Sequence, residues 1–293
     1  MAYAWAGVAE LGHFGKRLEA WLGVAGDAVI SVFYPAGCRL CEQFLTRATR
    51  LPICDACLAS FAALPVPVCD ICGSPVVAPF ALKALKPVEP TASPEAPMAS
   101  ARFENMRGGC LGCQGRTFAF ARARSYAAYD GRLIRAIVML KFERIEPLAV
   151  WFAECLTKVV EREHLTADIV VPVALHRQRE SERGYNQADL IARPLARKLG
   201  LPYRAVLLTR TKPRPDKHIL SLSERWESVR GAFATRPGSQ VDNLRVLLVD
   251  DVLTTGATLD ACAKALLQAG AKSVVGLTVA RAVRHPVKVS DEL

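Results

Sequence analysis

The hydrophobic and polar positions after residue 118 alternate between patterns typical of strands and patterns typical of helices. Residues 246–249 are continuously apolar, as expected of a strand in a parallel sheet that helices cover on both faces. We predict strands at 118–129, 168–173, 205–209, 246–249 and 273–280, and helices at 131–142, 146–163, 188–199 and 258–269. This alternation predicts an α/β domain over residues 118–293, with a mostly parallel sheet flanked by helices.

Two stretches nearer the N-terminus have different patterns. Residues 14–34 carry apolar side chains at helical spacing and are followed by Pro35, which ends the pattern. We therefore expect residues 1–35 to form an amphipathic helical segment that docks on the rest of the protein. Residues 79–97 contain five prolines and follow neither helical nor strand periodicity. They predict a disordered Pro-rich insertion at about 76–107.

Eight of the ten cysteines occur in four Cys-x-x-Cys pairs. Each such turn directs two thiolates at one ion, and two turns complete the tetrahedral coordination that zinc prefers. Twelve residues separate the first two pairs, as expected between the knuckles of a small zinc ribbon. We therefore predict a double zinc ribbon over residues 36–117, with two structural zinc sites. The expected ligand sets are Cys38, Cys41, Cys54 and Cys57, and Cys69, Cys72, Cys110 and Cys113.

Other uses of these cysteines remain open from the sequence. The ligands of one site could come from non-consecutive pairs, and four thiolates could also hold an iron–sulfur cluster. Disulfides would fit a secreted chain, but Glu10 precedes the first basic residue, Lys16, so no positively charged leader is evident. A thioredoxin-like redox site would need one pair rather than four. Zinc bound by four thiolates leaves no open position for a substrate, so these sites are expected to stabilise the fold.

The formal net charge of +10 is concentrated in the second part of the chain. Residues 1–118 contain 10 basic and 9 acidic side chains, whereas residues 119–293 contain 28 and 19. This distribution suits a polyanionic ligand, either a phosphorylated small molecule or nucleic acid. No uncharged apolar run reaches the roughly 18 residues that a membrane-spanning helix requires. We therefore expect a cytoplasmic protein without membrane insertion.

The most informative stretch is the strand at 246–249 with the residues that follow it. Asp250 and Asp251 are expected at the carboxyl end of this strand, where ligands bind to open α/β sheets. The loop at 254–258 then opens a helix, and its backbone N–H groups can hold a phosphate. Two carboxylates would repel a phosphate alone, but they can accept hydrogen bonds from the hydroxyls of a sugar. The predicted ligand is therefore a ribose 5-phosphate.

This stretch, from the apolar strand through the two aspartates to Thr258, resembles the phosphoribosyl pyrophosphate (PRPP) signature of type I phosphoribosyltransferases. The resemblance implies that the aspartates hold the ribose hydroxyls, and that Mg²⁺ is held mainly by PRPP itself. Two other families with acidic strand ends do not fit. A Walker B strand would need an upstream Gly-x-x-x-x-Gly-Lys-[Ser/Thr] run, which this sequence lacks. A response regulator would need a whole receiver domain after its acidic pair, and only 42 residues follow Asp251 here. The residues implied to bind the 5-phosphate are Thr254, Thr255, Gly256, Ala257 and Thr258.

Arginines in the predicted loop at 174–187 are candidates for binding the pyrophosphate of PRPP. This loop should emerge at the same sheet edge as the aspartates, because both follow parallel strands. Arg177 and Arg183 could neutralise the departing pyrophosphate, and Gly184 makes Arg183 the better candidate because it allows close approach of the backbone. The candidate catalytic residues are Asp250, Asp251 and Arg183.

Neighbouring residues receive simpler interpretations. Lys141, near the end of the helix predicted at 131–142, is expected to be solvated rather than to face the pocket. Cys155 and Cys262 lie in predicted helices and are interpreted as small buried residues. Residues 212–225 are basic and contain prolines, and they resemble the mobile flap that covers PRPP in type I enzymes.

Several motifs in a fixed order extend the resemblance. They are the four Cys-x-x-Cys turns, Leu140-Lys-Phe, Pro172-Val-Ala-Leu, Glu182-Arg-Gly-Tyr-Asn-Gln, Leu220-Ser-Leu-Ser-Glu-Arg, Gly231-Ala-Phe and the Asp-Asp signature. Together they resemble the ComF family of bacterial competence-associated proteins, from about Cys38 to Ala280. The resemblance implies a double zinc ribbon followed by a type I phosphoribosyltransferase-like domain, and a link to DNA uptake or to the processing of incoming DNA.

Two functions are compatible with these features. One is Mg-dependent transfer of a phosphoribosyl group from PRPP to an acceptor. Nothing in the sequence of the ribbons indicates a nucleobase pocket that would identify this acceptor. The other is a non-enzymatic adaptor, in which the ribbons and basic loops bind single-stranded DNA or a protein partner. In this hypothesis, PRPP or a nucleotide regulates the adaptor. The sequence specifies neither the acceptor nor the oligomeric state.

Overall fold

The computed structural model describes residues 37–45, 50–61, 63–64, 67–76, 110–213, 221–239 and 241–283. Three predicted features lie largely outside these residues. They are the helical segment at 1–35, the Pro-rich insertion at 76–107 apart from Val76, and residues 214–220 of the expected flap.

The chain forms two compact units, Met1–Phe61 and Ala62–Leu293. In the first unit, the short helix α2 (Asp55–Ala59) begins directly after Cys54 and carries Cys57. The second unit contains the α/β domain together with the third and fourth cysteine pairs. The division therefore falls inside the region predicted as one double ribbon, and the predicted domain limits at 36–117 and 118–293 do not coincide with it.

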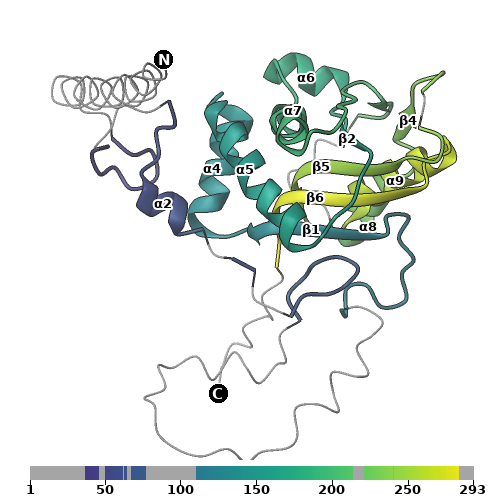
Figure 1. Ribbon diagram of the computed structural model, residues 1–293, viewed down its shortest axis with the longest axis horizontal. Coiled ribbons are helices and arrows are strands. Elements are labelled where there is room, and N and C mark those ends of the chain that lie inside the picture. Colours follow the sequence, from purple (N-terminus) through teal and green to yellow (C-terminus); the bar gives the residue numbers. More distant parts are fainter. Residues whose placement is uncertain are drawn as a thin grey trace, which may run out of the picture. The chain divides into compact units, whose positions relative to one another are not determined.

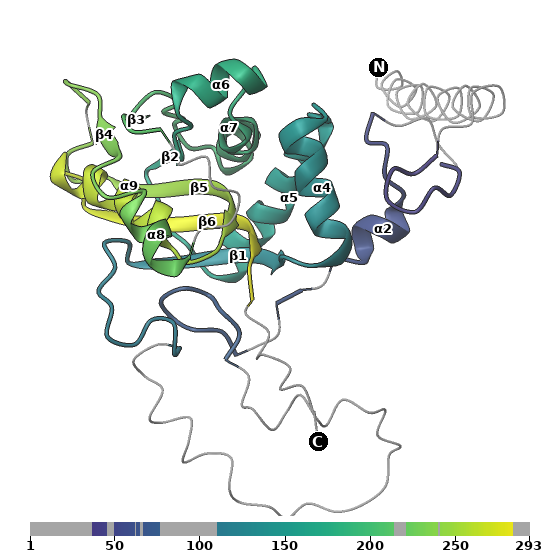
Figure 2. The ribbon, with the colours of Figure 1, turned by 180° about the vertical axis from the view of Figure 1, so that it is seen from behind.

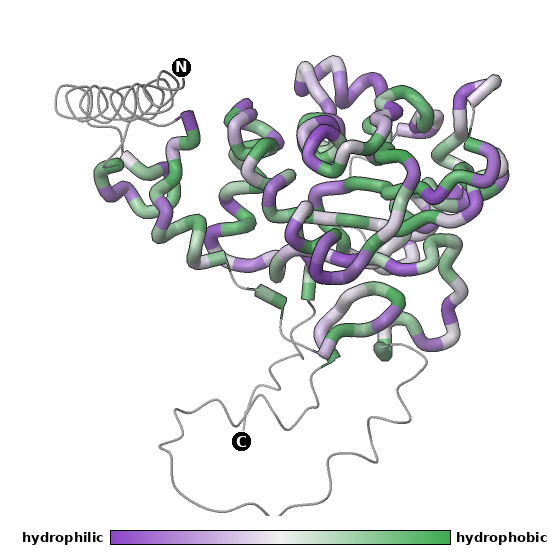
Figure 3. Tube along the Cα trace, in the orientation of Figure 1, coloured by the Kyte–Doolittle hydropathy of each residue, from purple (hydrophilic) through white to green (hydrophobic). Residues whose placement is uncertain are grey.

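The described part of the second unit is built on a parallel sheet with the strand order β1-β6-β5-β2 (Figure 1). The strands are β1 (Arg122–Ala128), β2 (Ile169–Pro172), β5 (Arg245–Leu253) and β6 (Ser273–Arg281). Every residue of β2 is buried, and β6 is buried along most of its length. Figure 3 shows the sheet region with many hydrophobic positions, and β2, β5 and β6 are the apolar strands. The parallel α/β sheet predicted from continuous apolar runs is confirmed.

Helices cover both faces of this sheet. α5 (Pro147–Arg162) and α7 (Gln187–Leu199) pack against each other and against one face, whereas α9 (Ala257–Gln268) covers the other (Figures 1 and 2). α4 (Gly131–Phe142) precedes α5 and packs against it. The bounds of all these helices agree with the predicted ones to within one residue at each end. None of the described helices is long and apolar enough to cross a membrane.

The structure differs from the prediction at residues 174–187, where a loop was expected. The segment contains α6 (Arg177–Arg183), none of whose residues is buried. Gln178 donates a hydrogen bond to Glu182 one turn later, at 3.0 Å, and Gly184 ends the helix in the left-handed conformation with φ of 83°. Because α6 lies on the surface, its sequence has no apolar stripe from which a helix could be predicted.

A smaller antiparallel sheet pairs β3 (Leu208–Arg210) with β4 (Phe233–Thr235). The strand predicted at 205–209 is therefore shorter and shifted, and it does not join the parallel sheet. Between the two strands, α8 (Leu222–Glu227) begins with a capping box at Ser221. The described end of the expected flap is thus a helix.

The first strand of the domain begins later than predicted. β1 starts at Arg122 instead of residue 118. Phe118 and Phe120 have ring centroids 4.8 Å apart, and Phe120 is buried in the core that the sheet shares with α9. The apolar residues at 118–121, which the sequence predicts as the beginning of the strand, therefore precede β1 and contribute to the core.

Candidate functional site

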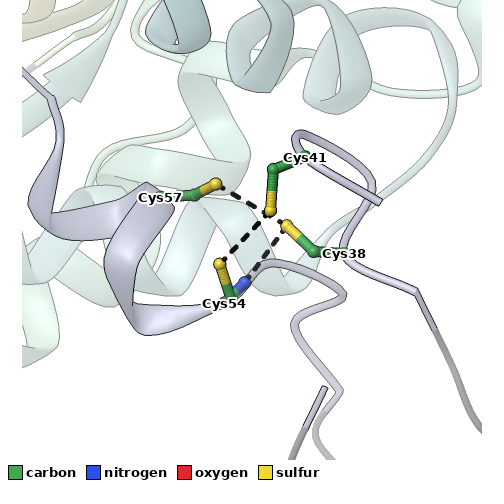
Figure 4. A group of neighbouring side chains, drawn as sticks. All are labelled: Cys38, Cys41, Cys54 and Cys57. Atoms are coloured by element: carbon green, nitrogen blue, oxygen red, sulfur yellow. Dashed lines mark hydrogen bonds between the residues drawn. The ribbon is translucent and has the colours of Figure 1, made fainter. Parts of the chain in front are cut away.

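The first two cysteine pairs converge on one point in the first unit. Figure 4 shows the four side chains pointing toward one another. The sulfur of Cys38 lies 3.8 Å from that of Cys57, and the sulfur of Cys41 lies 3.7 Å from that of Cys54. Four sulfurs about 2.3 Å from one zinc ion would lie about 3.8 Å apart in a tetrahedron. The first tetrad, Cys38, Cys41, Cys54 and Cys57, therefore has the dimensions of a zinc site.

The third and fourth pairs form an equivalent second tetrad in the second unit. The sulfurs of Cys69 and Cys113 are 3.9 Å apart, and those of Cys72 and Cys110 are 3.6 Å apart. These distances are far longer than a disulfide bond of about 2.0 Å. Each tetrad combines consecutive pairs, so the crossed arrangement that the sequence left open is not found among the described residues.

Backbone N–H groups surround the sulfurs of both tetrads. The amide of Cys54 donates to the sulfur of Cys38, and the amide of Cys110 donates to the sulfur of Cys69, each at 3.3 Å. Such donors favour the thiolate form that binds a metal and orient the ligand. The donor set and its surroundings fit structural zinc, as the spacing predicted.

The two aspartates of the signature lie within β5 rather than after it. The prediction that the strand ends before them is wrong, because β6 continues beside them: Asp250 pairs with Thr278, and Leu253 pairs with Arg281. The backbone of this stretch therefore keeps its strand hydrogen bonds. Asp250 is half-buried and Asp251 is buried, with 5% of its surface exposed. Both are near the carboxyl end of the sheet, as expected for a ligand site.

A cavity of about 330 Å³ opens at this edge of the sheet. It brings together both aspartates and most of the predicted phosphate loop. Its wall also includes residues 173–175, which follow β2, and residues from α7, β3 and α8. The signature residues that line it are Asp250, Asp251, Thr254, Thr255, Ala257 and Thr258.

Gly256 shapes the turn that joins the strand to α9. It has φ of 84°, which L side chains rarely adopt, and it is the N-cap of the helix. A Cβ at this position would lie 3.3 Å from the ring of Phe118 and 3.5 Å from that of Phe120. The backbone of the loop therefore rests directly on two aromatic rings. The loop presents the N-terminus of a 12-residue helix to the cavity, which is a favourable place for a phosphate.

Lys141 joins this cavity to a second one. Its Nζ lies 2.8 Å from Oδ2 of Asp251, and its side chain lines both cavities. The prediction that Lys141 is a solvated lysine is therefore wrong. The second cavity, about 350 Å³, is mostly basic and is lined by Lys141, Phe142, Arg144, Arg179, Glu182, Arg183 and Tyr185.

The two arginines predicted for the pyrophosphate have different positions. Arg183 lines the basic cavity, stacks over the ring of Phe142 at 4.9 Å and donates a hydrogen bond to Gln187. Burial lowers the pKa of Arg183 and the nearby carboxylate of Asp251 opposes that shift. Arg177 is exposed and is not among the described residues that line either cavity.

Several lining residues are not among the site residues predicted from the sequence. Asn186 is buried, caps α7 by accepting from the Ala188 amide at 3.0 Å, and donates to the carbonyl of Val173 at 2.9 Å. Its position just before a predicted helix was a capping signal, but it gave no indication of the cavity. The further polar lining residues are Tyr129, Gln187, Arg210, Arg225 and Ser228.

Comparison with known proteins finds one family model for each of two regions of the chain. A model of the double zinc ribbon domain matches residues 29–86, and a model of the phosphoribosyl transferase domain matches residues 187–292. The DNA utilization protein YhgH of Escherichia coli K12 is 32% identical over 170 residues, which cover 56% of this chain and 74% of that protein. Competence protein F of Haemophilus influenzae is 35% identical over 116 residues, 39% of this chain and 51% of that protein. The chain belongs to the ComF family.

Membership of the ComF family agrees with the architecture predicted from the sequence. Competence protein ComFC of Bacillus subtilis is 32% identical over 164 residues, 54% of this chain and 63% of that protein. The fold of the second unit is the type I phosphoribosyltransferase-like one, with a parallel sheet flanked by helices. The ribbon match ends at residue 86, before the fourth cysteine pair, and the structure places that pair in the second tetrad. The ribbon family and the two tetrads together support structural zinc.

A solved structure of glutamine PRPP amidotransferase from Bacillus subtilis shows a weak overall likeness. Its TM-score is 0.32 and its sequence identity is 23%, over 45% of this chain and 26% of that chain.

Proposed function

We propose that this ComF-family protein binds PRPP as its magnesium complex, and that it acts as a phosphoribosyltransferase-like protein in DNA uptake or utilisation. The observation that carries the proposal is that one cavity is lined by Asp250, Asp251 and four of the five residues of the loop at 254–258. The names of the relatives, competence protein and DNA utilization protein, support the biological setting.

The two cavities divide the ligand between them. The aspartates accept hydrogen bonds from the ribose hydroxyls, and the loop before α9 holds the 5-phosphate. The pyrophosphate extends toward the basic cavity, where Lys141 and Arg183 supply positive charge. Mg²⁺, when bound, neutralises part of the charge on the pyrophosphate.

Transfer of the phosphoribosyl group requires the same residues. Bond cleavage at the ribose leaves a positively charged, oxocarbenium-like centre and a departing pyrophosphate. Asp250 and Asp251 orient the sugar, and Arg183 stabilises the charge that develops on the leaving group. The proposed transfer involves no covalent intermediate with the protein, so catalysis depends on positioning and electrostatic stabilisation.

Calorimetry with magnesium-PRPP tests this proposal. The wild-type protein should bind the ligand, and changing both Asp250→Asn and Asp251→Asn should lower the affinity by at least about tenfold. Glu161→Gln, which alters an exposed acid on α5, serves as the control and should bind like wild type. Absence of wild-type binding would rule out the PRPP site. Release of pyrophosphate with nucleobases or amines as acceptors then tests turnover separately.

A second candidate function is binding of single-stranded DNA at the basic cavity. Phe142 is 67% exposed and lies beside Arg183, so an exposed aromatic ring and cations are combined on one surface. This combination suits the bases and phosphates of a single strand. Binding that weakens steeply with salt, and that weakens further in Phe142→Ala, would support this function. The Asp250→Asn and Asp251→Asn changes should leave it intact.

A further inference from the structure

Arg281, the last residue of β6, connects the second cysteine tetrad to the phosphate loop. Only 8% of its surface is exposed. Its Nη1 donates to the carbonyl of Leu253 at 2.9 Å and also to that of Thr254, the first residue of the loop. Its Nη2 lies 3.5 Å from the sulfur of Cys72. One buried guanidinium therefore contacts a metal-ligating sulfur and the start of the predicted phosphate site.

The charge of Arg281 suits this position. A zinc ion with four thiolate ligands has a formal charge of −2, so a metal-loaded tetrad attracts a buried cation beside it. The same guanidinium satisfies carbonyl oxygens at the end of β5. Its planar set of donors can contact the sulfur and the carbonyls at once, which an ammonium group on one stem cannot do equally well.

The knuckle that carries Cys72 is also fixed to the sheet. The amide of Ala123 in β1 donates to the carbonyl of Ile71 at 2.7 Å, and Nη1 of Arg124 donates to the carbonyl of Asp70 at 2.9 Å. Gly73 has φ of +63°, and a Cβ there would lie only 2.8 Å from the carbonyl oxygen of Ala123. The turn is therefore packed tightly against the edge of β1.

The segment that follows the tetrad reaches the phosphate loop from the other side. Phe118 and Phe120 support Gly256, as described above. The amide of Ala119 donates to Oδ1 of Asp260 in α9 at 2.7 Å, and Asp260 is only 2% exposed. The second tetrad is thus connected to the loop both through Arg281 and through the chain that leaves it.

We propose that Arg281 is a positioning residue that couples metal occupancy of the second tetrad to the conformation of the loop at 254–258. When the tetrad holds its metal, Arg281 is fixed by Cys72 and fixes the two carbonyls at the start of the loop. A second consequence rests on the proposed function. Metal at the second tetrad and ribose phosphate in the loop should stabilise each other's binding. Such coupling must be reciprocal.

Hydrogen exchange of the full-length, zinc-loaded protein tests the coupling without any ligand. Arg281→Gln should raise the exchange rate of the amides at 253–258 by about tenfold, while those of α5 stay unchanged. Metal analysis should show that the variant retains its zinc. If Arg281→Gln also loosens α5, Arg281→Lys, which keeps the buried charge, should show the local increase alone. Unchanged exchange at 253–258 in a folded variant would overturn the proposal.

Zinc release to a chelator tests the reciprocal effect, with ribose 5-phosphate as the probe. Saturating ribose 5-phosphate should slow release of zinc from the second tetrad of the wild type by about tenfold. The effect should disappear in Arg281→Gln and persist in Cys41→Ser, which alters the first tetrad. Equal slowing in Arg281→Gln and wild type would overturn the role of Arg281. If ribose 5-phosphate fails to bind, calorimetry with magnesium-PRPP decides the proposed function, and the exchange measurement decides the coupling.

Discussion

Lys141 and Asp251 form an ion pair across two elements that are far apart in the sequence, with Nζ of the lysine 2.8 Å from Oδ2 of the aspartate. The aspartate side chain is 7% exposed and the lysine side chain 22% exposed. Lys141 lies in the last turn of α4 and Asp251 lies in β5, so the pair fixes the helix end to the floor of the proposed ribose site. It is also the point where the two cavities meet.

This pair should contribute measurably to stability, because removing either partner leaves the other charge poorly solvated. Wild type, Lys141→Met, Asp251→Asn and the double variant form a double-mutant cycle in urea unfolding. We expect a coupling energy of roughly 1–3 kcal/mol. The exposed pair Lys198 and Glu154, whose charged atoms are 3.0 Å apart, is a matched control. Its coupling should stay below about 1 kcal/mol, and equal values for the two pairs would contradict the prediction.

The Gly256 turn should affect ligand binding more than an equally strained turn elsewhere. Gly256→Ala and Gly200→Ala both place a side chain at positive φ, which costs roughly 1–2 kcal/mol. A Cβ at Gly200 meets nothing within 4 Å, whereas one at Gly256 crowds Phe118 and Phe120. We expect Gly256→Ala to weaken binding of ribose 5-phosphate by about tenfold, and Gly200→Ala to leave it unchanged. Calorimetry measures both, and equal affinities for the two variants would argue against the loop as the phosphate site.

Particular residues show how far the sequence could predict this molecule. The ends of α4 and the parallel sheet were predictable, because helical spacing and continuous apolar runs report burial directly. The gathering of the cysteines into two tetrads followed from the geometry of Cys-x-x-Cys turns, whereas the pairing of consecutive turns was decided only by the structure. In contrast, α6 is entirely surface, so no apolar periodicity marked it.

The partners of single charged residues were less predictable. Lys141 is predicted to be solvated because a lysine at a helix end normally is, and only the tertiary arrangement brings it to Asp251 in β5. Arg281 lies just after the strand predicted at 273–280, and the sequence assigns it no role. Its contacts with Leu253 and Cys72 connect residues 28 and 209 positions away in the sequence. Such contacts depend on the tertiary arrangement and have no local signal.

The two cysteines outside the tetrads should be chemically inert in the folded protein. Cys155 and Cys262 are 3% and 0% exposed, and burial raises the pKa of Cys155 to about 12 and that of Cys262 well above its usual range. In the zinc-loaded protein neither should react with a thiol reagent over minutes. Unfolding with a chelator present should expose all ten thiols.

Metal analysis of the same samples separates the two classes of cysteine. Wild type should contain two zinc ions per chain, one for each tetrad. Cys54→Ser should lower the content by one, whereas Cys155→Ala should leave it unchanged. A rapidly reacting thiol that disappears in Cys155→Ala or Cys262→Ala would contradict the interpretation of these residues as buried packing groups.

The ionised carboxylate of Asp168 should stabilise the α/β domain, and acid should remove this contribution. Asp168 accepts hydrogen bonds from the side chain of Arg245, at 2.7 Å from Nη2, and from its backbone amide, and these lower the pKa of Asp168 to about 2. Because the pKa is lower in the folded protein than in the unfolded chain, the carboxylate stabilises the fold above its ordinary pKa of about 4. That contribution is lost as the pH falls from about 4 toward 2.

Asp168→Asn should therefore be less stable than wild type at pH 6, and the difference should shrink as the pH falls through this window. Urea midpoints measured for both proteins at each pH provide the comparison, since acid-induced loss of zinc affects both alike. Glu161→Gln, at an exposed position, should follow the wild-type curve. A constant difference between wild type and Asp168→Asn from pH 6 to 2 would show that the Asp168 hydrogen bonds do not require its charge.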